Sequence, residues 1–193
     1  MLNLIFQLPV YARSVARIAV AATRRSKRTF VRRDKGIDPS MRENVLTWQK
    51  KQLHSMTFEN VGPAKSSDGK IDLARMWRIH RSSLQAVRHD LDGMWQVSTD
   101  TLEKGRGISL DQSIVIMHRL RDAGFPDESL GVVSVQMGSR RHSFAVVQDR
   151  EDDFWMLDNG YFSNIPVRAS AYLAKKSGIV YLIGFNFFDV WTY

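Results

Sequence analysis

The sequence predicts an α+β fold with a largely antiparallel sheet, and three patterns support this prediction. Residues 109–123 have apolar side chains at helical spacing, and Gly124 follows as a helix stop signal. Short runs rich in β-branched and aromatic residues come next, separated by polar turns. These runs are 132–137, 143–147, 154–157 and 179–188. No βαβ unit repeats along the chain, which disfavours a doubly wound parallel sheet.

Two helices are predicted before this region. Residues 39–53 form the first, because Asp38 can cap it and Pro39 suits the first helical position. Residues 71–89 form the second, with an acid near its start. Residues 60–70 have the Gly, Pro, Ser and Asp content of a linker between the two helices.

Composition sets limits on function. The chain has 193 residues, of which 44% are hydrophobic and 25% charged, as in an ordinary globular domain. No apolar stretch approaches the roughly 20 residues that cross a bilayer, so no transmembrane helix is expected. The sequence contains no cysteine, which excludes disulfides, thiolate metal sites and a thiol nucleophile. We predict no cofactor.

The positive charge is concentrated at the N-terminus. Residues 1–56 carry 12 Lys and Arg against 3 Asp and Glu, a net charge of +9. Residues 57–193 carry 16 against 17, a net charge of −1. We therefore predict a basic arm with helical segments over 1–56 and a domain over 57–193. The candidate polyanion- or partner-binding cations of the arm are Arg13, Arg17, Arg24, Arg25, Lys27, Arg28, Arg32 and Arg33.

Several interpretations of this arm remain open. Arg13 and Arg17 interrupt the apolar run too early for a secretory signal, so a location inside the cell or within an assembly is expected. An Arg-rich, acid-poor segment of this kind fits a mitochondrial-type presequence. It also fits a retained arm that binds a protein partner, nucleic acid or an anionic membrane surface. A basic tail without fixed structure is the simplest interpretation.

Three short segments contain residues that could act together in catalysis. Residues 107–111, at the predicted helix start, read Gly-Ile-Ser-Leu-Asp. Residues 141–146 read Arg-His-Ser-Phe-Ala-Val on a predicted strand, and residues 155–159 read Trp-Met-Leu-Asp-Asn at the end of the next one. A helix N-terminus stabilises a thiolate or an oxyanion, and a histidine oriented by a carboxylate serves as its base. This order predicts a nucleophile, base and orienting group.

The run from residue 95 to 159 resembles the bacterial transglutaminase-like cysteine peptidases. Their pattern is G-x-G-D-C-E-D at a helix start, then H-x-V-L, then V-L-D-N. Gly105 and Gly107 match the glycines, while Asp111, His142 and Asp158 match the last acid of the first motif, the histidine and the closing acid. The resemblance implies a papain-like, transglutaminase-like fold, in which the helix carrying the nucleophile position packs on the sheet.

The departures from this pattern imply a degenerate member that lacks the catalytic cysteine. Ser109 stands at the cysteine position, so Ser109, His142 and Asp158 are the triad positions. Ile108 and Leu110 replace two acids that help bind calcium in well-known members of the family. The resemblance therefore implies a lost metal site and a triad that no longer acts.

Each triad position also has a structural interpretation. Ser109 could be a helix N-cap, because a hydroxyl is much harder to ionise than a thiol. His142 could be a buried histidine with satisfied hydrogen bonds, and Asp158 could stabilise a turn after its strand. The other histidines show no metal-ligand spacing and are read as surface or helix residues, and Trp191 and Tyr193 as either core or a partner anchor.

The leading prediction is an inactive homologue, or pseudoenzyme, that serves as a structural or interaction subunit of a larger assembly. A virion and an organellar complex both fit the arm and the missing cysteine. One alternative is a serine-dependent hydrolase or peptidase that uses the three triad positions. Another is a binder of nucleic acid or anionic membrane through the basic arm.

Overall fold

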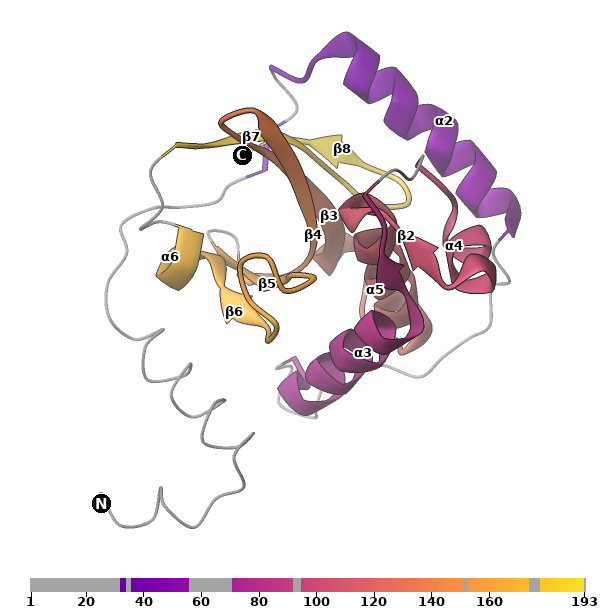
Figure 1. Cartoon of the computed structure of the whole chain (residues 1–193). Helices are drawn as coiled ribbons and strands as arrows, with labels where there is room; N and C mark the ends of the chain where they lie inside the picture. The colour runs from indigo at the N-terminus through magenta and orange to yellow at the C-terminus, as the bar shows by residue number, and fades with distance from the viewer. Residues whose placement is uncertain are drawn as a thin grey trace.

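The computed structural model describes residues 32–33, 36–55, 71–91, 95–150, 153–173 and 178–192 (Figure 1). The helices are α2 (Pro39–Ser55), α3 (Leu73–Ala86), α4 (Ser98–Lys104), α5 (Ser109–Asp122), the 3-10 turn η2 (Asp127–Ser129) and α6 (Ala169–Tyr172). The strands are β1 (Arg88–His89), β2 (Arg106–Gly107), β3 (Leu130–Met137), β4 (Arg140–Arg150), β5 (Asp153–Leu157), β6 (Val167–Arg168), β7 (Ile179–Phe185) and β8 (Val190–Trp191). The predicted linker at 60–70 lies outside these residues.

The main sheet has six strands in the order β6-β5-β4-β3-β7-β8, and every neighbouring pair is antiparallel. A separate parallel pair joins β1 to β2. In the β3–β4 register, Val135 lies opposite His142 and Ser134 lies opposite Ser143. The predicted α+β class with a largely antiparallel sheet is therefore confirmed.

The two faces of the sheet bury separate hydrophobic clusters, because successive side chains of a strand point to opposite faces. Ala145 and Val147 of β4 join one cluster with Ile114 and Met117 of α5. Their neighbours Phe144 and Val146 join the second cluster, together with residues of α6. We call these the α5 face and the α6 face. Figure 1 shows α5 and α3 together on one side of the molecule, and α6 beside β6.

The predicted helix at 71–89 extends beyond the observed end of α3 at Ala86. Asp72 caps its start, accepting a hydrogen bond of 2.9 Å from the Arg75 N–H. Helix α3 stops at Ala86, because Val87 takes extended dihedral angles and the next two residues pair with β2. Val87 is β-branched and buried, so it fits the start of an extended segment better than a helix end.

The region after β7 also differs from prediction. The expected strand 179–188 ends at Phe185 and turns back into β8. Asn186 makes this turn, since its side-chain oxygen accepts the N–H groups of Phe188 (2.9 Å) and Asp189 (2.7 Å). The short helix α4 and strands β1 and β2 were not predicted.

Helix α2 begins as predicted, with Asp38 accepting the N–H groups of Ser40 (2.9 Å) and Met41 (3.1 Å). This helix precedes the predicted boundary at residue 56, yet its Val45 and Trp48 belong to the hydrophobic cluster of the α5 face. The described part of 1–56 therefore shares its core with residues beyond 56. None of the helices in the described ranges is long and apolar enough to cross a membrane.

Trp191 lies in a slot on the sheet and is only 3% exposed. A Cβ atom at Gly184 would come within 2.3 Å of its indole Nε1, and one at Gly131 within 2.6 Å of its ring. The Arg32 guanidinium covers the indole at 3.8 Å and donates a 2.9 Å hydrogen bond to the Glu128 carbonyl. Trp191 therefore serves the core, and its alternative use as a partner anchor is not available.

Candidate functional site

The N-terminus of α5 is built around a buried acid. The Asp111 carboxylate accepts hydrogen bonds from the N–H groups of Ile108 (3.1 Å) and Gln96 (2.8 Å). Burial raises the pKa of this carboxyl group. Gly107 is required beside it, because a Cβ there would lie 2.7 Å from the Asp111 Cβ. Asp111 thus holds the backbone just before Ser109 in place at the start of the helix.

Ser109 is the first residue of α5, and Ile108 occupies the N-cap position. Ser109 is therefore not the N-cap, which corrects that interpretation. The Asp111 carboxylate, three residues after Ile108, accepts the Ile108 N–H, as the third residue of a helix does for its N-cap residue. The Ser109 carbonyl accepts a 2.7 Å hydrogen bond from the Ser113 hydroxyl. Within the described residues, the Ser109 hydroxyl itself makes no hydrogen bond.

His142 and Asp158 form a buried hydrogen-bonded pair. His142 Nε2 donates to one Asp158 carboxylate oxygen, and the two residues are 6% and 0% exposed. The other Asp158 oxygen accepts the N–H groups of Phe162 and Ser163, the latter at 3.2 Å. Asp158 therefore does both things expected of it, orienting a histidine and stabilising the turn after β5.

Aromatic rings surround the His142 imidazole. The ring centroids of Tyr161, Phe162 and Phe144 lie 5.0, 5.1 and 6.3 Å from that of His142. Tyr161 is itself 57% exposed, whereas His142 is 6% exposed. Such packing favours a structural histidine over one that meets a substrate.

Ser109 and His142 are not brought together. His142 lies opposite Val135 and next to Phe144, both of which belong to the cluster of the α6 face. Ser109 stands at the start of α5, which packs on the other face. In sequence, His142 is flanked by Arg141 and Ser143, and alternation turns these two neighbours toward Ser109.

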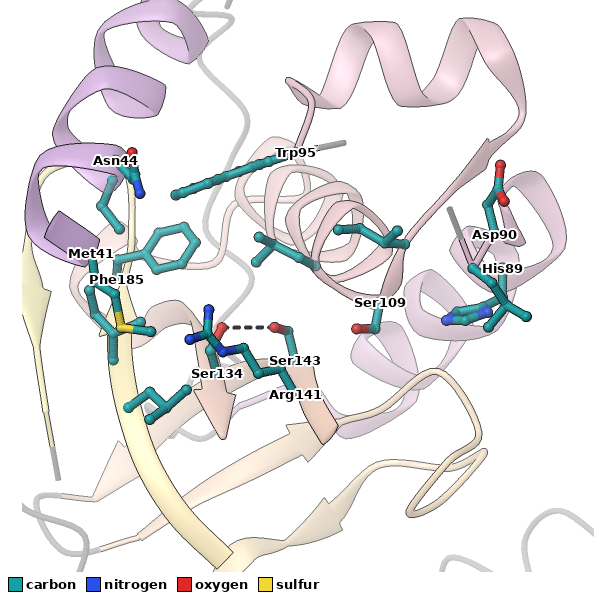
Figure 2. Close-up of a pocket in the computed structure, with 16 residues that line it drawn as sticks. Met41, Asn44, His89, Asp90, Trp95, Ser109, Ser134, Arg141, Ser143 and Phe185 are labelled. Atoms are coloured by element: carbon teal, nitrogen blue, oxygen red, sulfur yellow. Dashed lines mark hydrogen bonds between the residues drawn. The ribbon is translucent and has the colours of Figure 1, made fainter. Parts of the chain in front are cut away.

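A pocket of about 470 Å³ contains Ser109, and His142 does not line it. Figure 2 shows Ser109, Arg141 and Ser143 around this pocket, with Ser134 bonded to Ser143 through their hydroxyls at 2.7 Å. His89 and Asp90, after α3, also line it. Its other lining residues are Met41, Asn44, Val45, Leu91, Trp95, Ile108, Leu110, Leu182, Ile183 and Phe185.

The sequence predicts that His80 is a surface or helix residue, and it is a helix residue that is fully buried. Its Nε2 donates a 2.6 Å hydrogen bond to the Asp158 carbonyl, and burial lowers its pKa. Its Nδ1 is buried without a hydrogen-bond partner in the described residues. His80 therefore holds the backbone of the residue that orients His142.

Gln112 of α5 also connects the site to distant segments. Its side chain donates to the Val87 carbonyl and accepts from the Asn159 amide, both at 2.8 Å. Asn159 is the last residue of the motif that ends at β5. Helix periodicity could predict that Gln112 is buried, but not that it joins α3 to the end of β5.

A second serine–histidine contact has a structural role. Ser98 Oγ lies 2.5 Å from His118 Nδ1, and His118 Nε2 lies 3.5 Å from Asp122. Gln52 donates to the Ser98 hydroxyl at 2.8 Å, and Ser98 is fully buried. This network joins α2, α4 and α5 and leaves no space for a substrate at the hydroxyl. Burial lowers the pKa of His118.

The residues at the α5 start do not fit a calcium ion. Calcium takes six to eight oxygen ligands, but Ile108 and Leu110 supply no side-chain oxygen. Asp111 is the one acid within residues 107–111, and both of its carboxylate oxygens already accept backbone N–H groups. In the described part of the chain, no group of three or more His, Cys, Asp or Glu residues could hold a metal ion.

Most of the predicted arm cations lie outside the described residues: Arg13, Arg17, Arg24, Arg25, Lys27 and Arg28. Arg32 and Arg33 are described, and both contact the domain. Arg32 stacks on Trp191, and Arg33 forms a backbone bridge with Thr192. A role for these two residues in binding a polyanion stays a prediction.

Comparisons with known proteins agree with this architecture. Legionella pneumophila LapG aligns with 92% of this chain and 87% of its own, at a TM-score of 0.54 and 16% identity. Its calcium-bound structure gives the same values, and its EGTA-treated structure covers 84% of that chain. LapG has the transglutaminase-like cysteine protease fold. This chain has a papain-like fold of that kind. No family model and no curated protein matches the sequence.

Proposed function

We propose that this chain is an inactive homologue of transglutaminase-like peptidases that serves as an interaction subunit of a larger assembly. The observation that carries the proposal is the separation of Ser109 from His142. The sheet presents Ser143 and Arg141 to the pocket that Ser109 lines, whereas His142 belongs to the opposite face. A virion or an organellar complex remains a suitable setting for such a subunit.

The chemistry of a serine nucleophile supports this proposal. A hydroxyl must lose its proton during attack, so it needs a base within about 2.6–3.2 Å. The Ser109 hydroxyl makes no hydrogen bond in the described residues, and the His142 imidazole is packed among aromatic rings. The remaining features of an active site, a helix N-terminus and an open pocket, suit binding as well as catalysis.

The first experiment is labelling of the purified chain with a serine-directed fluorophosphonate. We expect no labelling of the wild type above the level of the Ser109→Ala variant. Labelling that disappears in Ser109→Ala would identify an activated serine and overturn the proposal in favour of a serine hydrolase. Circular dichroism of both proteins confirms that they are folded.

A second experiment uses the absence of cysteine, because Ser109→Cys introduces a single thiol. The pH dependence of its alkylation by iodoacetamide gives the pKa of that thiol. We expect the same pKa when His142→Ala is added, since the imidazole lies on the other face of the sheet. An increase of about one unit or more on adding His142→Ala would demonstrate a coupled pair and contradict the separation.

The basic arm supports a second, compatible candidate function. Residues 1–33 contain no acid, and eight cations occur there. Binding to nucleic acid or an anionic membrane through this segment is expected to weaken steeply with salt. Deletion of residues 1–31 should abolish that binding and leave the domain folded. Binding that is insensitive to both salt and deletion would exclude the arm as the contact.

A further inference from the structure

The pocket beside Ser109 has an apolar floor. Val45, Ile183 and Phe185 line it, and each is at most 5% exposed. At about 470 Å³, the pocket is large enough for one or two side chains of a bound molecule. Leu91, which is 86% exposed, extends the apolar surface at its edge. This lining suits an apolar side chain of a partner.

Arg141 and Asp90 are the charged side chains that line the pocket, and Arg141 is the one without an ion-pair partner in the described residues. Arg141 lines it, is exposed, and makes no hydrogen bond or ion pair within the described residues. Its positive charge contributes to the lowered pKa of Asp38, but that carboxylate is already used to cap α2. Asp90, the acid that lines the pocket, lies 3.9 Å from the Arg106 guanidinium. Arg141 therefore has no committed acidic partner.

Two further groups favour a carboxylate near Arg141. The α5 N-terminus carries a partial positive charge, and the first residues of a helix have N–H groups without intrahelical partners. The Ser109 hydroxyl on this helix lines the same pocket and can donate a hydrogen bond. Figure 2 shows the Arg141, Ser143 and Ser109 side chains around the space that a ligand would enter.

We propose that this pocket binds an acidic segment of a protein partner. An apolar side chain of that segment fills the floor, and a neighbouring Asp or Glu side chain binds Arg141. This inference rests on the proposed interaction function and names the chemistry of the partner. The arm of a second copy does not fit, because residues 1–33 contain no acid and their cations are repelled by Arg141.

The test uses three fluorescein-labelled peptides with amidated C-termini, so that the three differ in charge only through their side chains. The first is Ser-Gly-Leu-Asp-Leu-Asp-Gly-Ser. The second replaces both Asp residues with Asn, and the third replaces both Leu residues with Ser. Binding to the full chain is measured by fluorescence anisotropy. The protein variants are Arg141→Gln and the matched control Arg140→Gln, whose residue is exposed on the same hairpin but does not line the pocket.

We expect the first peptide to bind about fivefold more tightly than its Asn version and at least about tenfold more tightly than its Ser version. Arg141→Gln should remove the preference for Asp, whereas Arg140→Gln should keep it. Absence of binding, equal binding of the Asp and Asn peptides, or equal effects of the two Arg variants would overturn the inference.

Mass spectrometry of the same mixtures separates this inference from the proposed function. Cleavage of a peptide that depends on Ser109 would overturn the inactive assignment, while the peptide preferences would still test the pocket. Failure of all peptides to bind, with no cleavage and no fluorophosphonate labelling, would reject the pocket inference alone. Arg141→Gln and Arg140→Gln both replace exposed side chains, and circular dichroism verifies that each variant is folded.

Discussion

We predict that Asp158→Ala strongly destabilises the fold, although the sequence resemblance assigns Asp158 to a catalytic position. The residue is fully buried, and its carboxylate accepts hydrogen bonds from His142, Phe162 and Ser163. Alanine leaves all three donors without this acceptor. One unsatisfied buried donor costs about 1–3 kcal/mol. Water can reach part of the loop after β5, which lowers the total below the sum for three donors. We therefore expect a loss of about 3–5 kcal/mol in the free energy of unfolding.

Urea unfolding followed by tryptophan fluorescence measures this loss. Asp158→Asn keeps one carbonyl oxygen and should cost about half as much. Glu103→Ala, on the exposed face of α4, is the control and should change the free energy by at most about 0.5 kcal/mol. Ser109→Ala should behave like this control. A loss below about 1 kcal/mol in Asp158→Ala would refute the structural role assigned to its hydrogen bonds.

Two further predictions concern pH and packing. Burial lowers the pKa of His80 and His118 below their unfolded values near 6.5, so the unfolded chain binds more protons as pH falls. Their contribution to stability is complete above about pH 6.5 and is lost below it. Urea unfolding midpoints measured at pH 7.5, 6.5 and 5.5 will detect this loss. An unchanged midpoint would contradict the lowered pKa of the two histidines. Gly184→Ala should cost about 1–3 kcal/mol, because its Cβ would clash with Trp191. Replacing Trp191 with Leu in the same chain should recover part of that cost in a double-mutant cycle of thermal unfolding, and strictly additive losses would argue against the clash.

Local patterns predicted much of the fold. Helix α5 follows its apolar spacing, and Gly124, with φ of 86°, stands just beyond its end as expected. Strands β3, β4 and β5 follow runs of β-branched and aromatic residues, because those residues pack well on a pleated surface. Helix α4 was missed, since seven residues are too few to show a clear period.

The arrangement of the site was harder to predict, because it depends on contacts between distant segments. The sequence grouped His142 with Asp158, and the two are hydrogen-bonded although they are 16 residues apart, His142 on β4 and Asp158 just after β5. It could not show which sheet face His142 occupies, since a shift of one residue in register reverses every side chain. The burial of His80 depends on a carbonyl 78 residues away, and no local pattern records such a contact.

The attachment of the N-terminal segment to the sheet has a mechanical consequence. Arg33 exchanges two backbone hydrogen bonds with Thr192, of 2.8 and 2.6 Å, and the Arg32 guanidinium stacks on the Trp191 ring. If an assembly held the chain by its first residues, tension would reach the edge strand β8 before it reached α2. Strand β8 pairs with β7 at two positions, so few pairings between the strands would resist its detachment. The Arg32–Trp191 contact and the two Arg33–Thr192 hydrogen bonds would therefore be the first contacts to carry that load.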